Sequence, residues 1–234
     1  MSEGLTALDW GRIGDELDGR GWALARVLTP AECAASIALW SDERSFRKQV
    51  VMARHGFGEG VYKYWRYPLP SAIAAMRSVL YARLAPIAER WRLRLGTPDE
   101  AFPETHTDYL RRCHAAGQTL PTPLLLRYEA EGYNCLHQDL YGAHVFPLQA
   151  AFLQSQPQAD FTGGEFALVE QRPRAQSRVE IVPLQQGDML IFAVNHRPVQ
   201  GGRGWYRMRM RHGVGRIRRG ERHTLGIILH DAES

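Results

Sequence analysis

The spacing of apolar and polar residues divides this chain into a helical first half and a β-rich second half. After Pro70, apolar residues recur at helical intervals from Ile73 to Trp91, and this periodicity predicts a long helix. Other elements expected before residue 120 are helices over 5–20, 29–40 and part of 98–117, a strand over 22–28, and an irregular segment over 43–69.

From residue 121 onward, short apolar runs alternate with turn signals such as Gly163-Gly164. Strands are predicted over 123–128, 145–153, 165–170, 178–182, 188–194, 205–214 and 223–229. Many short strands with regular punctuation are typical of a two-sheet sandwich or barrel. We therefore expect an α+β fold, in which residues 121–234 form the β core. Residues 1–120 are expected to buttress one sheet with helices, and to hold a substrate-recognition segment, without being an independent domain.

The bulk composition is that of a globular protein, with 234 residues, 44% hydrophobic and 23% charged. No apolar stretch approaches the roughly 20 residues of a membrane span, and the N-terminus lacks the apolar segment of a secretion signal. Cys33, Cys113 and Cys135 show no CxxC spacing and are expected to be reduced, mostly buried thiols. These features predict a cytoplasmic protein with no membrane partner, and they leave the oligomeric state open.

Positive charge is concentrated in one part of the chain. From Gln171 to Arg222 there are 12 arginines against Glu180, Asp188 and Glu221. A concentrated basic surface favours polyanionic partners such as nucleic acid. An ordinary solvated face, in a chain that uses arginine almost to the exclusion of lysine, explains the same excess equally well.

Two imidazoles and a carboxylate form the most informative motif. His137 and Asp139 follow a predicted strand, and residues two apart in an extended segment project to the same side. His212 comes 73 residues after Asp139. Two histidines and one carboxylate hold iron(II) on one face and leave the opposite positions open for a co-substrate and dioxygen. The sequence therefore predicts an iron site.

Other histidines offer weaker alternatives. His106-Thr107-Asp108 is a second HxD, but it lies in a loop that leads into a helix, where Asp108 is better explained as a surface charge. For His144, His223 and His230, packing or hydrogen bonding is a better explanation than metal ligation.

The distal ligand has one competitor, His196, with Arg203 seven residues further on. His212 fits better, because a strand ends there and a returning strand begins at Arg222. Arg222 and Thr224 share a face of that strand. The planar fork of an arginine can bind a carboxylate through two parallel hydrogen bonds.

These motifs resemble the iron(II)/2-oxoglutarate dioxygenase superfamily, which implies a double-stranded β-helix (jelly roll) with helices against one sheet. The ten-residue step from His212 to Arg222 resembles prolyl-hydroxylase-type members. Residues 125–128 and 134–139 resemble AlkB-type DNA demethylases, in which a tyrosine nine residues before the first ligand binds 2-oxoglutarate. Tyr128 has that offset, although Leu126 replaces the AlkB asparagine. As a whole the chain is most similar to a bacterial oxygenase family linked to oxidative removal of alkyl damage from DNA.

The resemblance implies iron(II), 2-oxoglutarate and dioxygen as cofactors, with Arg222, Thr224 and Tyr128 at the far carboxylate of 2-oxoglutarate. It also implies oxidative demethylation of alkylated DNA. A hydroxylase of a protein side chain or small metabolite is the alternative. A non-enzymatic nucleic-acid-binding domain is disfavoured, because plain binding needs no metal ligands.

A mixed aromatic and basic segment in the first half is the candidate substrate-binding region. Tyr62, Tyr64, Trp65 and Arg66 offer stacking surfaces for a flipped base and a phosphate contact. The alternative is that these aromatic residues anchor an irregular segment to the core.

Overall fold

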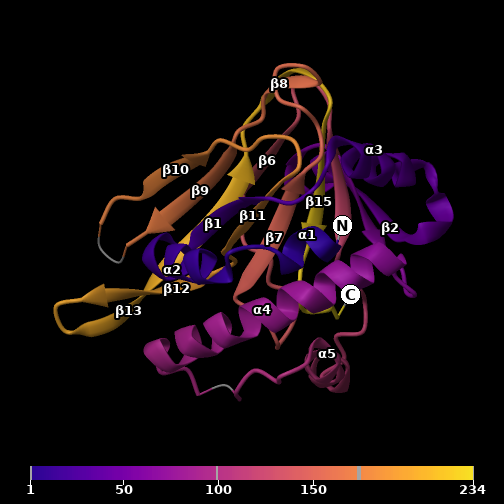
Figure 1. The fold of residues 1–234 in the computed structure, drawn as a ribbon. Helices are drawn as coiled ribbons and strands as arrows, with labels where there is room; N and C mark the ends of the chain where they lie inside the picture. Colours follow the sequence, from indigo (N-terminus) through magenta and orange to yellow (C-terminus); the bar gives the residue numbers. More distant parts are fainter. Residues whose placement is uncertain (1, 99, 173–174, 234) are drawn as a thin grey trace.

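The computed structural model describes residues 2–98, 100–172 and 175–233 (Figure 1). Its α-helices are α1 (Ser2–Thr6), α2 (Trp10–Arg20), α3 (Pro30–Ala38), α4 (Ser71–Leu95) and α5 (His106–Ala115). The long helix after Pro70 and the helix within 98–117 are confirmed. The expected helix over 5–20 is divided in two, because the Asp9 side chain accepts a hydrogen bond from the Arg12 backbone N–H and starts α2 separately.

The strands form two main antiparallel sheets. The larger sheet has the order β1 (Trp22–Arg26), β11 (Asp188–Ala193), β7 (Leu148–Leu153), β15 (Arg222–Ile227), β5 (Leu124–Tyr128), β4 (Val61–Trp65) and β2 (Phe46–Val51). The smaller sheet has the order β10 (Arg178–Val182), β9 (Phe166–Gln171), β13 (Gly204–Val214), β6 (Tyr133–His137) and β3 (Gly58–Glu59), and β12 (His196–Gly201) pairs with β13. A short pair joins β8 (Phe161–Gly163) to β14 (Ile217–Gly220).

Every apolar run after residue 121 forms a strand as predicted, but the expectation that 43–69 is irregular is wrong. That segment contains β2, β3 and β4. Its alternation is hard to recognise because a register shift between Phe46 and Lys48 interrupts β2. In β4, Lys63 is buried, where its ammonium lies 2.5 Å from Glu43 and over the ring of Trp40.

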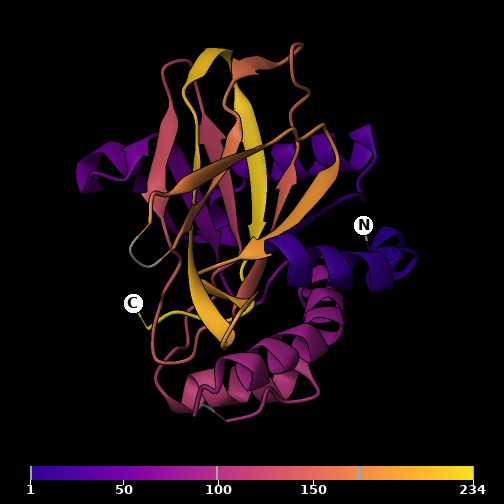
Figure 2. The ribbon, with the colours of Figure 1, turned by 90° about the vertical axis from the view of Figure 1, so that its left-hand side faces the viewer.

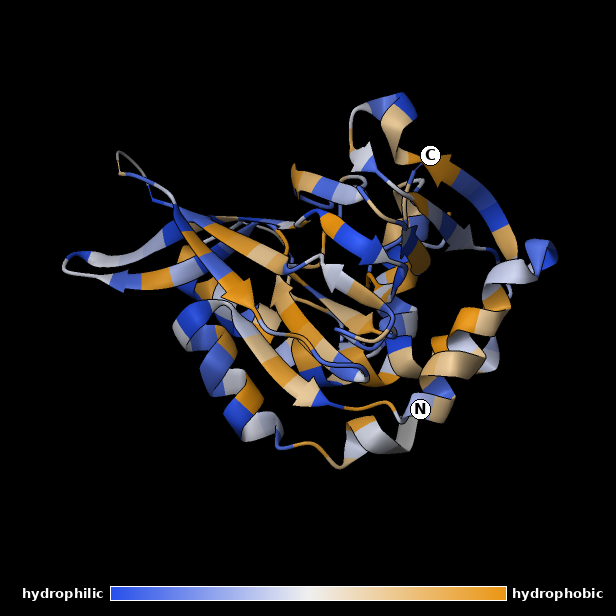
Figure 3. Cartoon of the chain, turned by 90° about the horizontal axis from the view of Figure 1, so that it is seen from above, coloured by the Kyte–Doolittle hydropathy of each residue, from blue (hydrophilic) through white to orange (hydrophobic). Residues whose placement is uncertain are grey.

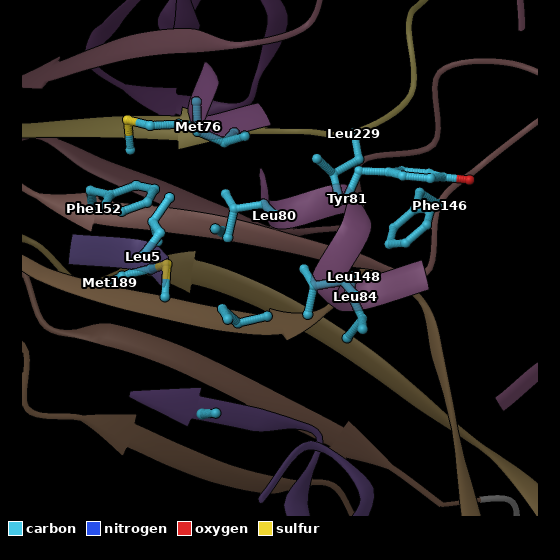
Figure 4. Packing of buried hydrophobic residues seen from close by; sticks show 14 of the residues in the cluster. Leu5, Met76, Leu80, Tyr81, Leu84, Phe146, Leu148, Phe152, Met189 and Leu229 are labelled. Atoms are coloured by element: carbon cyan, nitrogen blue, oxygen red, sulfur yellow. The ribbon is translucent and has the colours of Figure 1, made fainter. Parts of the chain in front are cut away.

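Alternate residues of the larger sheet belong to two different cores. On β7 and β11, Phe152 and Met189 face α4, where Leu80 and Leu84 pack against them (Figure 4). Turned by 90°, the structure shows α4 and α5 as a layer beneath the strands (Figure 2). The intervening residues, such as Phe192, pack between the two sheets against residues of the smaller sheet. The space between the sheets therefore has apolar walls.

Polar residues concentrate on the projecting hairpins, while the enclosed strands are mostly apolar (Figure 3). Cys33 and Cys113 are buried free thiols, and Cys135 is an exposed one. Among the helices of the described residues, none has both the length and the apolar character needed to cross a bilayer.

A buried arginine of α4, Arg77, binds the C-terminal segment through hydrogen bonds and an ion pair. Arg77, only 1% exposed, donates from Nε to the Ile228 carbonyl at 2.9 Å and from Nη2 to the His230 carbonyl at 3.0 Å. The same Nη2 lies 2.8 Å from Asp231, whose side chain is fully buried. A buried ion pair of this kind is held by its surrounding hydrogen bonds, and loss of Arg77 leaves the buried carboxylate with only the Tyr67 hydroxyl and His114 beside it among the described residues.

We expect Arg77→Met to lower the free energy of unfolding by about 3 kcal/mol or more, because Asp231 would stay buried without its guanidinium. Chemical denaturation measures this difference. The control is Arg111→Met, which removes the exposed pair with Asp108 on α5 and should change stability by less than about 1 kcal/mol. Equal, small effects of the two substitutions would show that the Arg77 pair adds nothing to the fold.

Candidate metal centre

The two histidines are brought together by the pairing of β6 with β13. His137 is the last residue of β6 and lies directly opposite His212 in the register, with the ring centroids 4.1 Å apart. Asp139, two residues beyond the strand, folds back between them. Its Oδ1 lies 3.5 Å from His137 Nε2 and its Oδ2 lies 3.3 Å from His212 Nε2. All three ligand atoms lie within 4.8 Å of one another, which is close enough to share one ion.

Hydrogen bonds orient two of these ligands. His137 Nδ1 lies 2.8 Å from the Cys135 carbonyl oxygen, so this nitrogen carries the proton and the Nε2 lone pair is free for a metal. The Asp139 carboxylate is held at both oxygens. Tyr141 donates to Oδ1 at 2.6 Å and the Gln149 amide donates to Oδ2 at 2.7 Å. Neighbours of this kind fix the orientation of a ligand before the metal arrives.

The electrostatics favour the protonation states that a metal requires. Burial disfavours the charged form of Asp139, but the hydrogen bond from His212 and the adjacent imidazoles outweigh it and hold the carboxyl pKa well below its usual range. Burial, together with nearby His137, lowers the pKa of His212. A charged carboxylate beside a neutral imidazole is the state of this donor set that binds iron(II). The residues present therefore fit the ion.

The larger sheet supplies a second polar group opposite these ligands. Gly220, with φ of 82°, makes the turn that starts β15, and a Cβ there would lie 1.9 Å from the Asp160 carbonyl oxygen. Arg222 then lies opposite Tyr128 of β5 in the register and donates to Thr224 Oγ1 at 2.5 Å. The residues predicted to bind the co-substrate carboxylate therefore meet on one pair of strands.

Arg222 is a buried cation on which the Glu165 carboxylate acts electrostatically, but with which it forms no ion pair. It is 1% exposed, its Nε has no hydrogen-bond partner, and no ion pair to it occurs within the described part of the chain. Burial lowers its pKa to about 10, so it remains charged at neutral pH. An unpaired buried guanidinium is costly, and a bound carboxylate removes that cost.

One cavity of about 330 Å³ connects these groups. Its lining includes the three candidate iron ligands together with Arg222, Thr224 and Tyr128. Apolar side chains of both sheets, among them Leu126, Phe166 and Phe192, form much of the rest. A site with apolar walls and a few convergent polar groups is typical of a binding pocket for a small ligand.

The predicted substrate-binding segment is divided by the alternation of β4. Tyr62 and Tyr64 line the cavity. Trp65 points to the opposite face of the strand and is fully buried. Its ring stacks on that of Phe46, with the centroids 4.4 Å apart, so it belongs to the core and not to the cavity. Arg66 is exposed, outside the cavity lining. The packing alternative therefore describes Trp65 correctly, because a strand directs successive side chains to opposite faces.

The two alternative histidines, His106 and His196, lie outside the group of candidate metal ligands. His106 is buried, with Nε2 2.9 Å from the Leu229 carbonyl oxygen, and Asp108 pairs with Arg111 on the surface. His196 lies on β12 opposite Arg209 and belongs to no group of potential metal ligands among the described residues.

Sequence reasoning missed Gln149 and Tyr141. Gln149 is the single polar residue in the apolar run of β7, and this interruption is a usable signal. Tyr141 follows Asp139 by two residues, but it lies outside the strands, so its contact with the carboxylate arises from a turn that the pattern does not reveal.

Similar solved structures place this architecture in a known class. A prolyl 4-hydroxylase from Pseudomonas putida is 14% identical with a TM-score of 0.54, covering 93% of this chain and 96% of that one. An oxidoreductase of the 2OG-Fe(II) oxygenase family from Burkholderia pseudomallei is 15% identical with a TM-score of 0.53, covering 97% and 94%. At these identities the likeness shows the fold alone, which is the predicted jelly roll of the 2-oxoglutarate oxygenases.

The sequence comparisons define the family. Residues 60–232 match the model of the Oxygenase-NA family, described as an oxygenase catalysing oxidative methylation of damaged DNA. An uncharacterized protein of Mycobacterium tuberculosis, present in two strains, is 49% identical over 165 residues, which are 70% of this chain and 70% of the relative. The chain therefore belongs to the Oxygenase-NA family. It is an oxidoreductase that uses iron(II), 2-oxoglutarate and dioxygen.

We expect Asp139→Ala and His212→Ala to weaken iron(II) binding about 100-fold or more, because each removes one of three ligands. Anaerobic titration calorimetry measures the affinity. The matched controls are Asp108→Ala and His196→Ala, which alter the two rejected ligand candidates and should leave the affinity for iron(II) unchanged. Equal losses in both pairs would mean that the metal is not held by the cavity residues.

Proposed function

We propose that this protein oxidises N-alkyl groups of damaged DNA bases, with the base entering the cavity between the two sheets. His137, Asp139 and His212 would hold iron(II), and Arg222, Thr224 and Tyr128 would hold 2-oxoglutarate. The observation that carries the enzymatic part is the unpaired, buried guanidinium of Arg222 in the same cavity as three convergent metal ligands. A dicarboxylate that chelates the metal and extends to an arginine satisfies both features.

The cofactors supply the oxidation. With both cofactors held by these residues, the site would supply hydroxylation of a substrate C–H bond by dioxygen, with conversion of 2-oxoglutarate to succinate and carbon dioxide. Hydroxylation of an N-methyl group gives a hemiaminal that releases formaldehyde and restores the base.

The side chains of this protein bind, orient and exclude water. Arg222 and Thr224 provide donors for the far carboxylate of 2-oxoglutarate. The Tyr128 hydroxyl, which accepts a hydrogen bond from Asn134 at 3.3 Å, has a pKa raised to about 12 by burial, so it stays protonated and can donate. Phe166 and Phe192 pack against the His212 ring and keep solvent from that side of the ligands.

DNA as the substrate is supported by the family description and by the aromatic rings around the cavity. Tyr62 and Tyr64 form part of its wall, and Phe57, which is 47% exposed, also lines it. The His55 ring stacks on Phe57 with the centroids 5.3 Å apart. The exposed rings of Phe57 and His55, next to a pocket walled by Tyr62 and Tyr64, suit the extraction of a base from its stack. The substrate would be single-stranded or locally opened DNA.

Hydroxylation of a protein side chain or small metabolite is the second candidate. It is favoured by the position of Arg222 ten residues beyond His212, which resembles the spacing of prolyl hydroxylases. The Pseudomonas putida structure with the same fold is itself a prolyl 4-hydroxylase. This candidate uses the same cofactors and differs only in what enters the cavity.

A substrate panel separates the two candidates. With iron(II) and 2-oxoglutarate supplied, we expect N-methylated single-stranded oligonucleotides to yield formaldehyde in an amount equal to the succinate formed above the uncoupled background. Peptides and free metabolites should give only the background succinate of the uncoupled reaction. Stimulation by a peptide or metabolite, without any by methylated DNA, would establish the second candidate instead.

We expect Arg222→Met to raise the KM for 2-oxoglutarate about 30-fold or more, because a buried, charge-assisted contact is lost. Arg222→Lys should recover only part of that loss, since an ammonium cannot bind a carboxylate through two parallel bonds. Succinate formation over a range of co-substrate concentrations measures both effects. Arg219→Met, an exposed site on β14, is the control. An unchanged KM in Arg222→Met would exclude the arginine from the co-substrate site.

A further inference from the structure

A row of three arginines lies on the face of the smaller sheet that is turned away from the metal centre. Along β13, Arg207, Arg209 and Arg211 alternate with Met208, Met210 and His212, which are buried. We call these three residues the arginine row. Arg207 and Arg209 are exposed and Arg211 is half-buried, and the row spans about 14 Å at the usual rise of a strand.

None of the three guanidinium groups takes part in an ion pair within the described part of the chain. Other arginines of the same region are neutralised. Arg197 and Arg178 both lie against Glu170, at 2.5 Å and 2.9 Å, on the opposite face of the sheet. The arginine row therefore presents uncompensated positive charge to solvent.

In the described strands β9, β10 and β12, the residues that share this face with the arginine row are not acidic. In the register, Arg211 lies opposite Val169, which lies opposite Val179, and Arg209 lies opposite Gln171. On the other side, Arg209 pairs with His196 of β12. Burial lowers the pKa of His196, and the charges of Arg207 and Arg209 lower it further. The histidine therefore lies within the positive field of the row.

The two ends of the row lie near two different hollows. At one end Arg211 precedes His212, and Gln138 of the cavity lining donates to the Met210 carbonyl at 2.8 Å. At the other end Arg207 lines a separate hollow of about 390 Å³, between the hairpin and the C-terminal part of α4. Beyond it lies Trp205, on the projecting hairpin formed by β12 and β13 (Figure 1). This residue is 41% exposed, and its ring centroid lies 4.5 Å from the guanidinium carbon of Arg94 on α4.

We propose that the arginine row binds the sugar-phosphate backbone of a single-stranded nucleic acid whose damaged base occupies the cavity, with Trp205 stacking a base further along the strand. This inference rests on the proposed function, since it needs a strand at the cavity. Regularly spaced, unpaired guanidinium groups next to an exposed ring suit a strand of phosphates and bases. An acidic peptide would satisfy the charges but has no use for a stacking surface.

The experiment measures binding of an unmodified single-stranded oligonucleotide by fluorescence anisotropy over a range of salt concentrations. The test variant carries Arg207→Gln, Arg209→Gln and Arg211→Gln together. The control removes the same charge elsewhere, through Arg83→Gln, Arg218→Gln and Arg219→Gln, at sites that are all exposed. A third variant replaces the arginine row with lysines. Thermal unfolding and uncoupled succinate formation verify that each variant is folded with an intact metal centre.

We expect the negative slope of log affinity against log salt to become shallower by about 2 in the test variant, since each phosphate contact on a single strand contributes about −0.7. This corresponds to about 100-fold weaker binding at about 0.1 M salt. The lysine variant should keep most of the slope, and the control should bind within about threefold of the unmodified protein. Trp205→Ala should weaken binding about fivefold or more without changing the slope.

Equal binding by the test variant and the control would overturn the inference, as would equally effective competition by polyglutamate of matched charge. The proposed function fails separately. If the arginine row is needed for DNA binding but no methylated oligonucleotide yields formaldehyde, the backbone site stands and the demethylation does not. If the test variant releases formaldehyde from a methylated oligonucleotide with an unaltered KM for that oligonucleotide, only the backbone site is refuted.

Discussion

The register between β6 and β13 positions the whole candidate site, because it sets His137 opposite His212. A slip of one residue would turn one imidazole to the other face of the sheet and separate the ligands. The pairing is close at this point. A Cβ at Gly213, next to His212, would lie 2.7 Å from the Asn134 carbonyl oxygen, closer than side chains approach backbone, so the strand needs glycine there. The register shift between His212 and Val214 lies at the same place.

The two sheets then divide the chemistry. The smaller sheet carries the imidazoles, and the larger sheet carries Arg222, Thr224 and Tyr128 across the cavity. Both sides bury charge, but only one is compensated. Asp139 is surrounded by donors, whereas Arg222 has no ion-pair partner among the described residues. A fold selected for stability alone would not keep an unpaired guanidinium at 1% exposure, so the cost is better explained by a ligand that the site binds.

The sequence predicted the candidate ligands and the short spacings between them, and failed where the packing of a strand decides which face it buries. His137 and Asp139, and likewise Arg222 and Thr224, are two apart on extended chain, so their shared direction follows from geometry alone. By contrast, β6, β8, β12 and β14 went unpredicted, because none of them contains an apolar run long enough to stand out. Trp65 was misassigned for a related reason, since no pattern within 43–69 showed which face of β4 the core would cover.

That missed strand changes the nature of the cavity wall. Because β4 pairs with β5 in the larger sheet, Tyr62 and Tyr64 are held by a hydrogen-bonded ladder and not by an irregular loop. The Tyr64 hydroxyl donates to Tyr141 at 3.3 Å, and Tyr141 donates to the Asp139 carboxylate at 2.6 Å. The wall that a substrate would touch is thus joined to a metal ligand through two hydrogen bonds. Any displacement of that wall must either break this connection or turn the carboxylate, so β4 belongs to the support of the metal centre as much as to the pocket.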